Sequence, residues 1–201
     1  MPRENLGLAA LATAYGGDLD RARALNEQGR VGLTAPTMLA WSAYVDGEIA
    51  SAAGHLEEAE ARYREAVELA RRSGATFLVG VATVGLLAVL GTSGRVEDAL
   101  RGYADVIGYF ARTGNWTHLW TTLRNLAALL RRIGDDGPAA ALDRAADHAP
   151  DAPAVQDRAT PDPSDTPPPT RAEVLAVARE AIARNLSSAD DVQEGAEELR
   201  P

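Results

Sequence analysis

Short glycine-centred turns recur along this 201-residue chain, and their spacing constrains the fold more than any other feature. In four of them a glycine is followed five residues later by an alanine, and the glycines are 37, 40 and 40 residues apart. These pairs are Gly17 and Ala22, Gly54 and Ala59, Gly94 and Ala99, and Gly134 and Ala139. A second series, at Gly74 and Gly114, has arginine just before the glycine, which is typical of a helix C-terminus. The two series alternate, so the sequence predicts an all-α fold of antiparallel helix hairpins.

Residues 1–148 are expected to form an array of about four such hairpins. The expected helices cover residues 3–14, 18–30, 36–53, 55–72, 75–92, 95–112, 116–133 and 136–147. The alanines should mark close helix contacts, and Tyr63 and Tyr103, nine residues after their glycines, should be buried wedges. The outer hairpins have Asn26 and Asp143 at that position, and because terminal hairpins face water we expect these two side chains to be solvated.

The composition changes after the array. Residues 149–169 are rich in proline and aspartate and predict a disordered linker. Thr170 and Glu173 form a capping-box pattern at the start of an amphipathic helix over residues 170–186, followed by an acidic tail over residues 187–201. Two roles stay open for this helix: it caps the last hairpin, or it occupies a groove in place of a partner helix.

The composition also excludes several functions. Cysteine and lysine are absent, which removes thiolate metal sites, cysteine nucleophiles, Schiff-base lysines and the P-loop lysine, and fits a cytoplasmic location. The net charge of −9 gives no basic face, so no direct nucleic-acid binding is expected. His55, His118 and His148 lie at no metal-ligand spacing. We therefore expect no enzyme, no cofactor, no metal and no membrane span.

The repeat pattern resembles a known family. One hairpin resembles the tetratricopeptide repeat. It has the glycine, the alanine five residues later, the tyrosine nine later, a small residue twelve later (Ala66) and a small residue seven before the glycine (Gly47). The period of 40 residues is similar to that of the longer hairpins in the C-terminal sensor regions of large bacterial signal-transduction ATPases. These regulators include the LuxR type and the antibiotic-regulatory type with a bacterial transcriptional activation domain. The segment 112–126, RTGNWTHLWTTLRNL, is similar to the signature of their penultimate hairpin.

The resemblance implies a tetratricopeptide-like superhelical array over about residues 5–147, and the helix that begins at Thr170 is also similar to the extreme C-terminus of these regulators. The family's ATPase and transcription-factor activities are not implied, because the chain has neither a GxxxxGK[ST] loop nor a recognisable DNA-binding element. The chain therefore looks like a detached or truncated regulatory region.

Partner-binding residues are expected on the first helix of each hairpin, because these helices line the inner surface of such arrays. Trp116 and Trp120 belong to an apolar stripe and should be buried. The polar positions beside that stripe and on the preceding first helices give the predicted surface: Trp41, Tyr44, Glu48, Thr76, Thr83, Thr117, Thr121, Arg124 and Asn125.

Two functions are compatible with this surface. The first is a protein-interaction module that binds a peptide or helix of a partner, in line with the resemblance. The alternative is a domain that senses a small inducer, since the sensor region of the maltose-type activator in the resembling family binds a sugar. Exposed tryptophans, which could stack on a ligand, would favour the alternative, and buried tryptophans would favour the first function.

Overall fold

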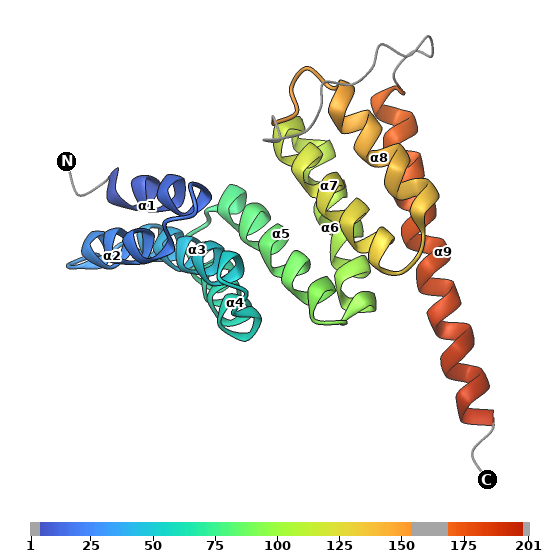
Figure 1. The fold of residues 1–201 in the computed structure, drawn as a ribbon, viewed down its shortest axis with the longest axis horizontal. Coiled ribbons are helices and arrows are strands. Elements are labelled where there is room, and N and C mark those ends of the chain that lie inside the picture. Colours follow the sequence, from blue (N-terminus) through green and yellow to red (C-terminus); the bar gives the residue numbers. More distant parts are fainter. Residues whose placement is uncertain (1–4, 154–168, 199–201) are drawn as a thin grey trace. The chain divides into compact units, whose positions relative to one another are not determined.

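The chain is helical throughout the part that its computed structural model describes, residues 5–153 and 169–198, where there are nine helices and no strand (Figure 1). This confirms the predicted all-α class, and the first eight helices lie within three residues of their expected bounds. The helices are α1 (Leu6–Tyr15), α2 (Leu19–Arg30), α3 (Pro36–Ala52), α4 (Leu56–Arg72), α5 (Thr76–Thr92), α6 (Val96–Thr113), α7 (Trp116–Arg132), α8 (Asp136–His148) and α9 (Arg171–Glu198).

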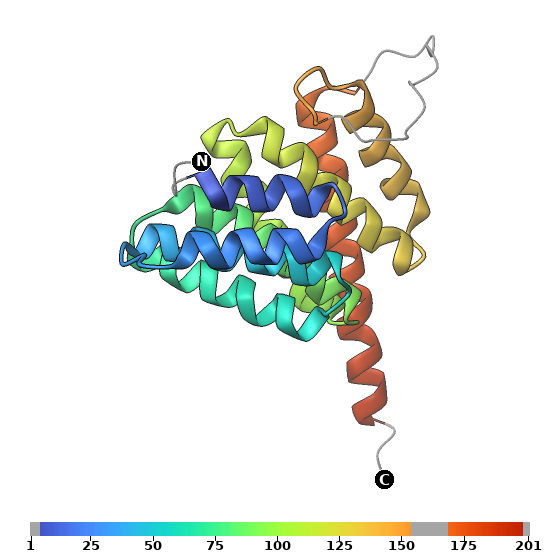
Figure 2. The same ribbon diagram turned by 60° about the vertical axis from the view of Figure 1, so that its left-hand side comes forward.

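Two compact units divide the chain, Met1–Gly94 and Arg95–Pro201. The sequence had suggested one array over residues 1–148, whereas the boundary falls at Gly94, within the third expected hairpin. In the first unit α1 packs against α2 and α3, and α5 packs against α3 and α4. Figure 2 shows α1 and α2 side by side in this unit.

Five of the turns between helices share one geometry. Glycines in the left-handed region of φ, between 71° and 86°, end these helices, and the N–H of the next residue donates to a carbonyl five residues earlier. His55 N–H, for example, donates to Ala50 O at 2.9 Å. This is the Schellman arrangement, which satisfies the last carbonyls of a helix and needs a residue without a Cβ at the turn. The turns of this kind within the units are centred on Gly17, Gly54, Gly74, Gly114 and Gly134.

Tyr63 of α4 fills the space between α3 and α5. Its side chain is buried. A Cβ added to Gly47 of α3 would lie 2.8 Å from Cδ1 of Tyr63, and a Cβ added to Gly85 of α5 would lie 2.4 Å from Cε1 of Tyr63. The two glycines therefore let both helices approach the ring faces. Ala22 and Ala59 are fully buried, as expected for positions of close helix contact.

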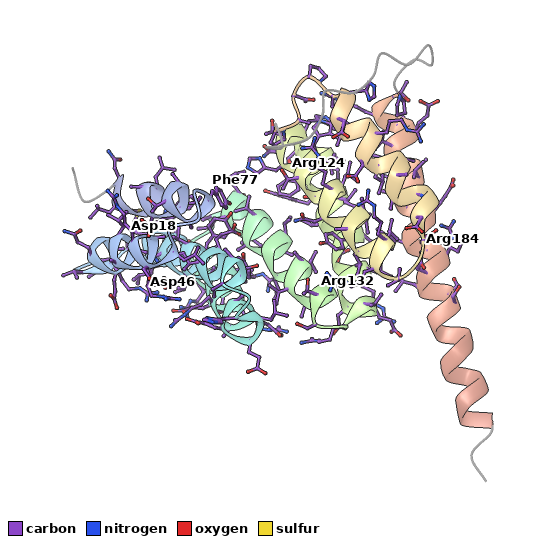
Figure 3. The ribbon with its side chains drawn as sticks, in the orientation of Figure 1. Asp18, Asp46, Phe77, Arg124, Arg132 and Arg184 are labelled. Atoms are coloured by element: carbon purple, nitrogen blue, oxygen red, sulfur yellow. The ribbon has the colours of Figure 1, made fainter. Side chains whose placement is uncertain are left out.

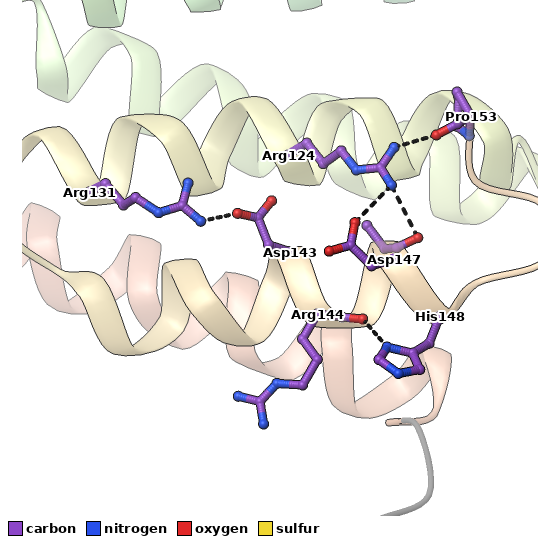
Figure 4. A network of polar contacts seen from close by, with 8 residues as sticks. Arg124, Arg131, Asp143, Arg144, Asp147, His148 and Pro153 are labelled. Carbon is purple, nitrogen blue, oxygen red and sulfur yellow. Dashed lines mark hydrogen bonds and ion pairs between the residues drawn. The ribbon is translucent and has the colours of Figure 1, made fainter. Parts of the chain in front are cut away.

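The expectation that Asn26 and Asp143 face water is wrong, because both side chains are buried. Asn26 Nδ2 donates to Ser42 O at 2.9 Å and to Asp46 Oδ1 at 2.6 Å. Asp143 forms an ion pair with Arg131 (Figure 4). Burial is tolerated at these positions since each polar group has a partner inside its own unit.

The second unit is a ring of four helices, in which α6 packs on α7, α7 on α8, α8 on α9 and α9 on α6. Ala99 and Ala139 are fully buried, as is Tyr103, which confirms its predicted place in the core. The other large side chains of this unit that are fully buried are Leu100, Ile107, Phe110, Leu119, Leu123, Leu126, Leu130 and Leu142.

Helix α9 begins with the predicted capping box. Thr170 N–H donates to Glu173 Oε2 at 2.7 Å, and Glu173 N–H donates to Thr170 Oγ1 at 3.3 Å. The helix continues to Glu198, well past the expected end at residue 186, and projects beyond α8 (Figures 1 and 2). The predicted acidic tail is thus helical over most of its length, while residues 154–168 of the predicted disordered linker lie outside the described residues.

The first half of α9 is fixed to its own unit by buried and polar contacts. Val174, Ala178, Ala181 and Ile182 are buried. Further along, Arg184 and Asn185 donate to Asp135, at the start of α8, at 2.6 Å and 2.8 Å. The main contacts of α9 are with α6 and α8, the helices on either side of it in the second unit.

Candidate functional site

The nine predicted surface residues fall in both units, five on α3 and α5 and four on α7. The structure brings three of them together on α3. Trp41, Tyr44 and Glu48 are spaced at i, i+3 and i+7, so they share one face of the helix. The Trp41 and Tyr44 ring centroids are 5.5 Å apart, and all three side chains are half-buried.

Two tyrosines that the sequence did not predict for this surface complete the cluster. Tyr15 at the end of α1 donates its hydroxyl to Glu48 Oε2 at 2.8 Å, and Tyr63 donates to Glu48 Oε1 at 2.7 Å. The Tyr44 and Tyr63 ring centroids are 6.2 Å apart. We name Tyr15, Trp41, Tyr44, Glu48 and Tyr63 the Glu48 cluster. Tyr63 could be recognised in the sequence as a buried wedge, but nothing in the pattern indicated where its hydroxyl would point.

The tyrosines of the cluster remain protonated over the whole physiological range. Burial, followed by the negative charge of Glu48, raises the pKa of Tyr44 and Tyr63 well above the usual value for tyrosine. Their hydroxyls therefore act as donors, and the carboxylate of Glu48 carries the negative charge of the cluster.

A cavity of about 160 Å³ opens beside Trp41, between α1, α2 and the segment that leads into α3. Gly7 forms part of its wall, where an added Cβ would lie 2.6 Å from Trp41 Nε1. Asn26 and Ser42 also line the cavity, and Ser42 Oγ donates to Asn26 Oδ1 at 3.4 Å. The apolar side chains that line it are Val31, Leu33, Met38 and Trp41.

The two predicted residues on α5 do not join this cluster. Thr76 is exposed at the start of α5 and Thr83 is half-buried. Within the described part of the chain neither side chain makes a polar contact with Glu48 or with its tyrosines.

In the second unit, Arg124 has a structural role (Figures 3 and 4). Its guanidinium donates to Pro153 O at 2.6 Å, to Ala146 O at 3.3 Å and to Asp147 Oδ1 at 3.2 Å. It thus satisfies carbonyls at the end of α8 and just beyond it, which is a favourable place for a cation. Its side chain is only 15% exposed, so it offers little to a partner.

The other predicted residues of α7 form no comparable cluster. Thr117 and Thr121 are exposed, and Asn125 is half-buried. Thr121 Oγ1 donates to Thr117 O within the helix at 3.4 Å.

Both tryptophans of α7 are used within their own unit. Trp120 is buried, as predicted, and donates Nε1–H to Asp151 Oδ1 at 2.8 Å. Trp116 is half-buried, and Arg171 lies over its ring at 4.2 Å while also pairing with Asp151 at 2.6 Å. These contacts tie α7, the segment after α8 and the start of α9 together.

The described residues offer no metal centre, since no three histidine, aspartate or glutamate side chains among them are grouped to hold an ion. His55 lies 3.6 Å from Glu58 and is exposed, and His148 Nδ1 lies 2.7 Å from Arg144 O. Burial lowers the pKa of His118, whose ring is 5.9 Å from that of Phe110.

Comparison with protein-family models, with curated proteins and with solved structures gave no match. In the part of the chain that the structure describes, no helix combines the length and the apolarity needed to cross a bilayer.

Proposed function

We propose that this protein is an interaction module that binds a peptide or helix of a partner protein on the surface formed by α1 and α3. The observation that carries the proposal is the Glu48 cluster itself. It places Tyr15, Trp41, Tyr44 and a carboxylate on the first helices of two adjacent hairpins, and Tyr15 is 65% exposed. Partly exposed aromatic side chains are the usual energetic centres of protein interfaces.

A tetratricopeptide-like superhelical array is the architecture we propose around this surface. Schellman turns at regular intervals, fully buried alanines at the helix contacts and the Tyr63 wedge between glycines support it. In such arrays the first helices of successive hairpins line the inner surface. By the resemblance given above, the protein would be a detached or truncated regulatory region of a transcriptional regulator, acting in the cytoplasm.

A protein segment suits this surface better than a small inducer. The cavity beside Trp41, at about 160 Å³, is smaller than the roughly 300–1,000 Å³ of ordinary small-molecule sites. It has room for one side chain of a partner. Of the other tryptophans, Trp120 is buried, and Trp116 already has the guanidinium of Arg171 over its ring. Stoichiometric binding without turnover is therefore the proposed activity.

A comparison of three forms of the full-length protein tests the proposal. Immobilised wild type, Tyr15→Ala and Thr121→Ala are exposed to cell extract, and retained proteins are identified and then rebound in purified form. We expect a partner that binds wild type and Thr121→Ala but not Tyr15→Ala. Equal retention by all three forms would contradict the proposed surface.

A screen of small metabolites by thermal shift and by tryptophan fluorescence tests the alternative. Stabilisation by a metabolite that also changes the Trp41 signal, without any Tyr15-dependent protein partner, would favour the small-inducer function. The Trp41 signal is isolated by replacing Trp116 and Trp120 with phenylalanine.

A further inference from the structure

Glu48 differs in its surroundings from the carboxylates that form ion pairs in the first unit. The ion pairs of that unit join an arginine or histidine to an acid elsewhere on the same or a neighbouring helix. They are Arg30–Asp46, His55–Glu58, Arg62–Glu65, Arg64–Glu60 and Arg72–Glu68. Within the described residues Glu48 has no cationic partner, and its oxygens accept hydrogen bonds from tyrosines instead.

Hydrogen bonds from tyrosines do not neutralise a carboxylate. The Tyr15 hydroxyl donates to Glu48 Oε2 and the Tyr63 hydroxyl to Oε1, and Tyr44 is also hydrogen-bonded to this carboxylate. A carboxylate offers about four lone-pair sites, so some acceptor capacity remains beside these three tyrosines. The side chain is half-buried, which weakens the screening of its charge by water.

The aromatic rings around Glu48 also favour a positively charged group. Tyr44 packs 5.5 Å from Trp41 on one side and 6.2 Å from Tyr63 on the other, measured between ring centroids. Aromatic ring faces carry negative potential and attract ammonium and guanidinium groups, with tryptophan the most effective. A half-exposed carboxylate beside partly exposed Trp and Tyr rings is therefore a site for a cation.

We propose that the Glu48 cluster binds the cationic side chain, arginine or lysine, of a basic segment in a partner protein. The inference rests on the proposed function and names the chemistry of the partner. Leu8 and Tyr15 lie seven residues apart on the same face of α1 and are 61% and 65% exposed. This apolar strip gives contacts to residues that flank the cation, which a small free cation would not use.

Selection from a random 12-residue peptide library against the full-length protein tests the proposal. Peptides are kept if they bind wild type but not Tyr15→Ala, and each is then tested on Glu48→Gln, a change that removes the charge and preserves shape. The control is Glu68→Gln, which alters net charge equally at an exposed position on α4. Selected peptides should share an arginine or lysine at one position.

Replacement of that arginine by citrulline, which has nearly the same shape and no charge, gives the quantitative test. We expect at least about tenfold weaker binding, the loss of one desolvated charge contact. Glu48→Gln should weaken the arginine peptide by a similar factor and leave the citrulline peptide unchanged, and Glu68→Gln should change neither. The arginine–citrulline comparison uses unaltered protein, so it holds even if Glu48→Gln folds poorly.

The outcomes separate this inference from the proposed function. Peptides that need Tyr15 but neither Glu48 nor a cation would overturn the inference and leave the interaction surface standing. Absence of any peptide that depends on Tyr15 or Glu48 would count against both. Competition by free arginine amide at the concentrations at which the peptide binds would identify a small-cation site and contradict a protein segment as the occupant.

Discussion

Replacement of Gly85 by alanine probes the packing that holds the first unit together. The new methyl group would lie 2.4 Å from Cε1 and 2.5 Å from Cζ of Tyr63. The ring has little room to move away, because Gly47 also packs against it and a Cβ added to Gly47 would lie 2.8 Å from Cδ1 of Tyr63. Overpacking of this kind costs about 1–3 kcal/mol. A displaced ring would also lose its 2.7 Å bond to Glu48, worth roughly 1.5–3 kcal/mol for a charged acceptor.

Alanine is a better helix former than glycine by about 1 kcal/mol, which opposes these losses. The net expectation for Gly85→Ala is a decrease of about 2–4 kcal/mol in the free energy of unfolding. Gly108→Ala is the matched control, because at that position of α6 the added Cβ would meet only the flexible end of Arg112, at 3.1 Å. It should stabilise the protein by roughly 0.5–1 kcal/mol.

Urea unfolding followed by far-UV circular dichroism measures both variants, and a double-mutant cycle assigns the cause. In a Tyr63→Leu background the ring is absent, so Gly85→Ala should become neutral or slightly stabilising. Two results would contradict the close approach of α4 and α5 through this tyrosine. One is that Gly85→Ala is as stable as wild type, and the other is that it lowers the free energy of unfolding equally with and without the Tyr63 ring.

Three further predictions concern single polar groups. The hydroxyl of Tyr103 is buried with no hydrogen-bond partner among the described residues, so Tyr103→Phe should be neutral or stabilising by up to about 1 kcal/mol in urea unfolding, and a clear loss would contradict this. Asn26→Ala should lower the free energy of unfolding by about 1–3 kcal/mol in the same assay, since it removes a buried amide that donates two hydrogen bonds. An unchanged midpoint would show that these bonds do not stabilise the unit. Burial alone would raise the pKa of Asp135, but hydrogen bonds from Arg184 and Asn185 outweigh it and lower the pKa below its usual value. The stabilisation of the folded protein by the Asp135 carboxylate is therefore present above the unfolded-state pKa of about 3.9 and is lost as pH falls through the lower folded-state pKa. The difference in urea midpoint between wild type and Asp135→Asn should therefore disappear at acid pH and persist at pH 7.

The helices and turns could be predicted because their signals are local. A glycine in the left-handed region ends a helix wherever it occurs, and the spacing of Gly54, Gly74, Gly114 and Gly134 therefore set the bounds of α3 to α8 nearly correctly. The end of α9 was missed since the acidic residues after residue 186 were interpreted as a tail, although alanine, glutamate and glutamine are good helix formers.

The polar side chains were harder, because their partners are distant in the sequence. Asn26 is buried by virtue of Ser42 and Asp46, and Arg124 is committed to Pro153, contacts that no periodic pattern encodes. Trp41, Tyr44 and Glu48 lie on one face because of their helical spacing. The contact of Tyr15 with Glu48 depends instead on how α1 packs against α3.

The central claim is that the surface of α1 and α3 binds a partner through the Glu48 cluster. Amide chemical-shift mapping of the full-length protein with an arginine-containing peptide selected only for binding to the wild type tests it most directly. We expect the largest shift changes to fall on Tyr15, Trp41, Tyr44 and Glu48, with α7 unaffected. Changes centred on Thr117 and Thr121 of α7, with α3 unchanged, would contradict it.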